Sequence, residues 1–143
     1  MRFMIIVKAT PDSEAGRWPA DSDRMFEAMR VYHEDLAKAG VLLDGSGLHP
    51  SSKGWRIRYA PDGKRTVVDG PFTEWKELIA GYTLIQVRSR EEAVEWARRF
   101  PNPTVEGTDC HIEVRQLFEL EDFEPNPAIE RFRELERAQE RAR

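Results

Sequence analysis

The residues best suited to chemistry lie around one broken strand in the middle of the chain, between Val67 and Tyr82. Asp69 stands directly before Gly70-Pro71, where the free backbone of glycine and the missing N–H of proline end strand pairing abruptly. A turn this constrained can hold the Asp69 carboxylate still at the mouth of a cavity, where it could act as an acid or a base. An aspartate before a turn also commonly caps it through its own backbone, so both roles are open.

Two histidines could exchange protons with Asp69, because an imidazole titrates near neutral pH without any perturbation. His33 follows Met29 by four residues at the border of the apolar stripe of a predicted helix, which suits either a packing residue or a pocket residue. His49 precedes Pro50, which biases its backbone to extended geometry and places its ring near a strand end. Asp69, His33 and His49 are therefore the candidate catalytic residues, with core or plain surface roles for the histidines as the alternative.

Four other side chains are candidates for binding a ligand. Glu74, Lys76 and Tyr82 follow the Gly-Pro break, and Arg115 shares one face of a predicted strand with two other ionisable side chains. If that face lines a dimer, Arg115 could bind an anion or pair with Asp69, whereas a charged row facing solvent is the simpler alternative. Glu74 and Lys76 could instead pin the turn and a dimer contact.

Metal and cofactor chemistry find no support in the sequence. Cys110-His111 has no second cysteine or histidine at ligand spacing, and the chain holds no phosphate-binding loop or nucleophile motif. We therefore predict no cofactor and no metal.

Hydrophobic periodicity predicts alternating strands and helices. A helix is predicted from about residue 23 to 39, a second from 89 to 100, and a charged helix from 128 to 143 after the Asn126-Pro127 cap. Residues 10–21 have loop composition, with Trp18 expected to fold back over the core or a cavity mouth. Strands are predicted at 3–7, from 41, at 55–59, 65–69, 81–87 and 111–118, the third and fourth forming a hairpin.

The broken strand also carries a resemblance. Its Asp69-Gly70-Pro71-Phe72, then Glu74, Lys76-Glu77 and Gly81-Tyr82, resembles the signature of the DGPF proteins within the YCII-related family. The resemblance covers most of residues 1–118. It implies a ferredoxin-like α+β fold, with an antiparallel sheet and helices on one face, that dimerises into an α/β barrel. It implies no established activity, although members are often suspected of being small enzymes and some lie beside or are fused to sigma factors.

Composition places the chain among soluble globular proteins. Its 143 residues are 40% apolar and 34% charged, which suits one domain at 1–120 with a helical extension at 121–143. The net charge of −4 argues against a surface built for nucleic acid, and no apolar run approaches the ~20 residues that span a membrane. The single Cys110 fits a reducing cytoplasm.

Together with the barrel that the resemblance implies, these residues predict a cytoplasmic homodimer that binds a small acidic or polar metabolite and acts on it with an Asp/His acid–base site in the barrel cavity. The alternative is a non-catalytic ligand-binding or regulatory protein that acts with a sigma factor. A third possibility is that the motif around Asp69 is purely architectural.

Overall fold

A computed structural model describes residues 1–104 and 108–143 and confirms the predicted α+β class. The main elements are β1 (Arg2–Lys8), α1 (Pro11–Glu14), α2 (Ser22–Lys38), β2 (Leu42–Gly47), β3 (Trp55–Tyr59), β4 (Arg65–Asp69), β5 (Ile79–Gln86), α3 (Arg90–Arg98), β6 (Ile112–Gln116) and α4 (Pro127–Ala142). Three short 3-10 turns lie at Ser51–Lys53, Trp75–Glu77 and Leu120–Asp122. Each predicted helix and strand is present, with bounds that shift by a few residues.

Four strands form the main sheet in the order β2-β5-β1-β6, with every neighbouring pair antiparallel. Ile5 lies between Thr83 of β5 and Val114 of β6, so β1 is one of the two inner strands, which suits the run of apolar residues from Phe3 to Val7. The sheet is open within one chain. The predicted barrel therefore needs a second copy and stays a prediction.

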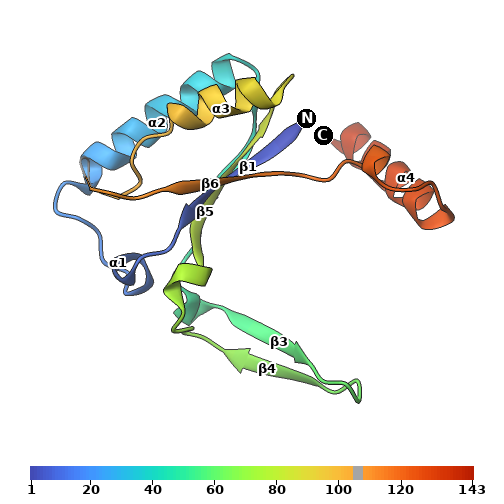
Figure 1. Cartoon of the computed structure of the whole chain (residues 1–143), viewed down its shortest axis with the longest axis horizontal. Helices are drawn as coiled ribbons and strands as arrows, with labels where there is room; N and C mark the ends of the chain where they lie inside the picture. Colours follow the sequence, from blue (N-terminus) through green and yellow to red (C-terminus); the bar gives the residue numbers. More distant parts are fainter. Residues whose placement is uncertain (105–107) are drawn as a thin grey trace.

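The core lies between the sheet and two helices that cover one of its faces, as Figure 1 shows for α2 and α3. Ile5, Leu36 and Ile85 are fully buried there because strand side chains alternate between faces and α2 directs one stripe inward. The hydroxyl of Tyr32 donates to the Trp96 carbonyl at 2.7 Å and so ties α2 to α3. Burial raises the pKa of Tyr32 to about 12.

The hairpin of β3 and β4 is a separate two-stranded sheet that projects from the body (Figure 1). Its strands and turn match the sequence prediction, but its independence from the main sheet was not foreseen. The physical reason lies at both ends, where Pro50 and Gly70-Pro71 interrupt the extended chain. The Gly70-Pro71 peptide bond is cis.

Two expectations for residues 10–21, an uninterrupted loop and Trp18 over the core, are wrong. Residues 11–14 form a short helix, α1, because Thr10 caps it and the Ser13 hydroxyl accepts in return from the Thr10 N–H. Trp18 does not cover the core: it is 66% exposed and packs against Phe26, with the ring centroids 5.0 Å apart. It does line a surface hollow formed by residues 12–21, in keeping with the alternative of a cavity mouth.

The C-terminal helix α4 begins as predicted, with the Asn126 side chain accepting from the Ile129 N–H at 3.0 Å. It lies beyond the end of the sheet, on the side away from α2 and α3 (Figure 1). Its apolar side chains Phe132 and Leu135 are exposed. Among the described residues, no helix has the length and apolar character required to cross a bilayer.

The core assignment predicts a sharp contrast between two leucines. Leu36→Ala should lower the free energy of unfolding by about 2–5 kcal/mol, because it removes fully buried methyl groups and leaves a cavity. Leu48→Ala, at an exposed position, is the matched control and should change it by less than about 0.5 kcal/mol. Urea denaturation measures both values, and equal losses would contradict the assigned core.

Candidate functional site

His33 lies on the helix-covered face of the sheet and both of its ring nitrogens are engaged. Nδ1 is 2.7 Å from the Met29 carbonyl oxygen, which can only accept, so Nδ1 carries a proton. Nε2 is 2.8 Å from Oγ1 of the buried Thr83, and in the neutral ring it accepts from that hydroxyl. A Cβ at Gly45 would come within 3.3 Å of the same nitrogen. His33 thus joins α2 to β5 in a closely packed place.

Asp69 and His49 lie elsewhere and both are exposed. Asp69 pairs with Trp55 at the base of the hairpin, and His49 stands in the segment after β2. Within residues 1–104 and 108–143, no hydrogen bond or ion pair joins Asp69, His33 and His49 to one another. One chain does not assemble these three side chains, and their catalytic role stays a prediction.

The turn after Asp69 is held by a network that the sequence did not reveal. The Ser51 hydroxyl accepts from the Phe72 N–H at 2.9 Å and donates to the Glu14 carboxylate, which also accepts from the Ser51 N–H at 3.0 Å. A Cβ on Gly70 would lie 1.9 Å from the Ser51 carbonyl oxygen, so only glycine permits this approach. We call Glu14, Ser51, Gly70 and Phe72 the motif clamp.

The remaining motif side chains are exposed to solvent. Glu74 and Lys76 lie at the short turn at 75–77, where the Lys76 ammonium is 5.6 Å from the centroid of the Trp75 ring. The Arg56 guanidinium lies 3.7 Å from the centroid of Phe72 and so fixes the base of the hairpin against the motif. Phe72 therefore positions the chain, whereas Glu74 and Lys76 face solvent.

Tyr82 makes the most specific polar contact on the other face of the sheet, which α2 and α3 leave uncovered. Its hydroxyl donates to Asp44 Oδ2 at 2.9 Å, and the Gly45 N–H holds Oδ1 of the same carboxylate at 2.9 Å. This hydrogen bond raises the pKa of Tyr82, because losing the phenol proton would break the bond and place two negative charges side by side.

Strand register brings Arg115 to the same face. Ile6 lies between Tyr82 and Glu113, and the next row on this face places Met4 beside Arg115. The Arg115 guanidinium is 3.5 Å from the Glu113 carboxylate. We call this surface the uncovered sheet face; its members are Met4, Ile6, Asp44, Tyr82, Leu84, Glu113 and Arg115.

The uncovered sheet face combines an apolar centre with polar groups on both sides. Met4, Ile6 and Leu84 are half-buried, and hydroxyl, carboxylate and guanidinium groups surround them. Such a surface can hold a small molecule by its apolar part and orient it by hydrogen bonds and charge. Asp44 was missed from sequence because only strand register places it beside Tyr82. The described residues include no cluster of side chains suited to a metal ion.

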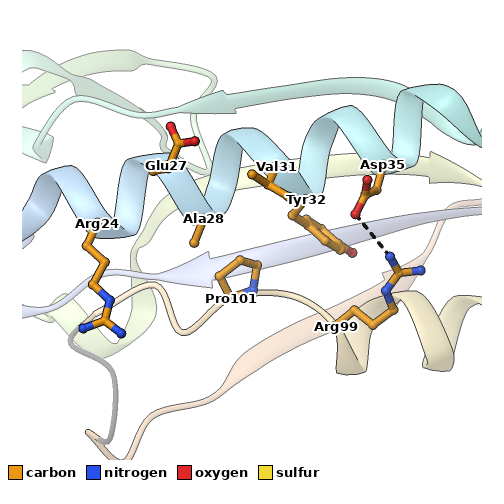
Figure 2. Close-up of a pocket in the computed structure, with 8 residues that line it drawn as sticks. All are labelled: Arg24, Glu27, Ala28, Val31, Tyr32, Asp35, Arg99 and Pro101. Atoms are coloured by element: carbon orange, nitrogen blue, oxygen red, sulfur yellow. Dashed lines mark hydrogen bonds and ion pairs between the residues drawn. The ribbon is translucent and has the colours of Figure 1, made fainter.

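Away from this face, a hollow of about 440 Å³ lies between α2 and the chain after α3 (Figure 2). Its apolar floor includes Val31 and Tyr32, and Arg99 forms an ion pair with Asp35 at 3.3 Å across it. The Tyr32 hydroxyl is engaged with the Trp96 carbonyl. The hollow is lined by none of the side chains that the sequence singled out for catalysis or binding, whereas the uncovered sheet face holds Tyr82 and Arg115.

Comparison with known proteins gives a family and two proteins to which the chain is similar. The model of the YCII-related domain matches residues 1–120. An uncharacterised protein of Rhizobium meliloti (strain 1021) is 30% identical over 92 residues, which is 64% of this chain and 73% of that protein. The solved structure of 5-chloro-2-hydroxyhydroquinone dehydrochlorinase from Burkholderia phenoliruptrix AC1100, in complex with 2,5-dihydroxybenzoquinone, is 18% identical with a TM-score of 0.42, over 82% of this chain and 94% of that one. At that TM-score the likeness carries no argument about this chain.

The motif clamp predicts that Gly70 tolerates no side chain. Gly70→Ala should destabilise the protein by about 1–3 kcal/mol, because the backbone at Ser51 must move away from the new methyl group. Gly54→Ala is the matched control: its Cβ would meet the same Ser51 oxygen at an ordinary 3.6 Å, on extended backbone. Thermal unfolding compares the two variants, and equal melting temperatures would refute the close contact.

Proposed function

The chain belongs to the YCII-related domain family, and from this premise we propose that it binds a small acidic or polar metabolite on the uncovered sheet face and acts on it by proton transfer. Two copies, paired through these faces, would enclose the bound molecule. The family membership itself names no reaction, so the proposal rests on the chemistry of the face.

The observation that carries the proposal is the hydrogen-bonded pair of Tyr82 and Asp44 beside an apolar centre. A phenol kept protonated can donate to a ligand oxygen if the ligand displaces or shares its bond to the carboxylate. Arg115, on the same face, suits a ligand carboxylate because guanidinium binds planar oxyanions through two N–H groups. An acidic metabolite with an apolar body fits this set of groups.

Pairing of two copies follows from the apolar character of the same face. Met4, Ile6 and Leu84 lie on the face of the sheet that α2 and α3 leave uncovered. Removing apolar surface from water is favourable, so a second copy that covers this face would be stabilised there. Specific protein interfaces typically bury ~1,200–2,000 Å² in total, an area that a four-stranded sheet face with its surroundings can supply.

Two acid–base sets are available for the chemistry. Asp44 is the carboxylate on the uncovered sheet face itself and is held by two hydrogen bonds. Asp69 with a histidine is the other set, and His49 suits it better than His33, since both nitrogens of His33 are already engaged. Either carboxylate could act as the general base.

The second candidate function is non-catalytic: a ligand-binding or regulatory protein of the cytoplasm that acts with a sigma factor. The exposed apolar side chains of α4, Phe132 and Leu135, together with Phe118, favour it, because such a surface suits a protein partner. Ligand binding without turnover would select this function over the first.

Removing one oxygen atom tests the binding site. Tyr82→Phe should weaken binding of the best hit from a panel of small carboxylic acids and phenols by about 3- to 10-fold, as expected for one lost hydrogen bond. Thr66→Val removes a hydroxyl from an exposed position on the hairpin and should leave the Kd unchanged. Isothermal titration calorimetry measures both, and identical affinities for the two variants would refute the site.

Two conservative variants then separate the acid–base sets. If Asp44 is the base, Asp44→Asn should lower turnover of the bound acid by ~10²–10⁴-fold while Asp69→Asn does little, and the reverse holds if Asp69 is the base. An architectural Asp69 would instead show as a loss of about 0.5–2 kcal/mol in stability, by analogy with helix caps. An Asp69→Asn protein that melts early yet binds and turns over normally would exclude a catalytic role for Asp69.

A further inference from the structure

The projecting hairpin has two chemically different faces. Strand register pairs Trp55 with Asp69, Ile57 with Val67 and Tyr59 with Arg65. Because side chains directly opposite in an antiparallel pair share a face, Trp55, Ile57, Tyr59 and Val67 form one continuous stripe, which we call the arm stripe. The residues between them, Arg56, Arg58, Thr66 and Val68, form the opposite face.

The side chains of the arm stripe are far more exposed to solvent than large apolar side chains usually are in a fully assembled protein. Trp55 is 65%, Tyr59 67% and Val67 62% exposed, and they lie next to one another. An isolated two-stranded hairpin is at best marginally stable in water, and clustered exposed apolar side chains mark interaction surfaces. The opposite face, by contrast, already has a partner from its own chain, since Arg56 stacks on Phe72.

Charge indicates what covers the arm stripe. Residues 55–69 contain four basic and two acidic side chains and carry a net charge of +2, whereas the whole chain carries −4. Of the −6 on the remainder, −3 lies in residues 119–143 and −3 on the rest of the domain. Arg65 lies on the stripe face, 4.8 Å from the centroid of the Tyr59 ring. A basic apolar arm on an acidic body is complementary to the body of another copy.

We propose that the β3–β4 hairpin is an intermolecular arm whose stripe docks on a second copy of this chain, against the acidic body that bears the uncovered sheet face. This inference rests on the pairing of copies proposed above. Asp44 and Glu113, which flank the apolar centre of that face, are the carboxylates that suit Arg65. The arm then closes the edge of the neighbouring ligand site, and the motif clamp fixes its direction.

Two adjacent substitutions test the arm, because neighbouring strand residues face opposite ways. Val67→Asp places a carboxylate in the stripe and should weaken dimerisation by roughly 10-fold or more, since it buries an unpaired charge at the contact. Thr66→Asp adds the same charge to the opposite face and should leave the dimer intact. Sedimentation velocity over a dilution series measures both dissociation constants, with circular dichroism confirming that both variants are folded.

A second measurement uses the wild-type protein alone. Trypsin cuts after the basic residues of the hairpin, such as Arg58 and Lys64, so cleavage there should slow as the protein concentration rises through the dimer range.

Three outcomes would contradict the arm. If the wild type is a dimer whose hairpin is cut equally fast at all concentrations, and Val67→Asp is still dimeric, the arm is overturned and the pairing of sheet faces stands. A monomeric wild type would overturn both. Binding of the hairpin to a single-stranded oligonucleotide, lost in Trp55→Ala, with no change in self-association, would also overturn the arm.

Discussion

The absence of a side chain at Gly70 is the constraint on which the placement of the β3–β4 hairpin and its flanking turns depends. At this point two segments of backbone meet so closely that Ser51 can bind both Phe72 and Glu14. That contact links α1, the turn after β2 and the start of the segment leading to β5. The hairpin leaves the body between these joined segments, so its direction is fixed by the same approach.

The two faces of the main sheet place the candidate residues in different surroundings. On the helix side, His33, which the sequence suggested for chemistry, is already engaged with Met29 and Thr83. On the other side, Tyr82 and Asp44 are held in place but are accessible. The same strand β5 supplies both Thr83 and Tyr82, so a difference of one residue separates a structural position from a candidate functional one.

The sequence predicted those features of the fold that depend on residues close together in the chain. The apolar stripe of α2, the Asn126-Pro127 cap and the alternation of the hairpin all involve residues within a turn or a pair of strands, and each is present. The motif clamp could not be predicted, because Glu14 and Ser51 are 37 residues apart and neither belongs to a recognisable pattern. Asp44 was missed for the same reason: its partner Tyr82 is 38 residues away, and register alone sets their contact.

The position of β1 in the sheet has a consequence for how the chain reaches this structure. β1 is made first but pairs with β6, which follows nearly the whole of the domain. Closing so long a loop is entropically costly and slow, whereas the hairpin and α2 need only neighbouring residues. During synthesis on the ribosome, the apolar side chains of Phe3 and Ile5 therefore remain incompletely buried until β6 has emerged. The interval before that pairing is when a nascent chain is most exposed to aggregation and to capture by chaperones.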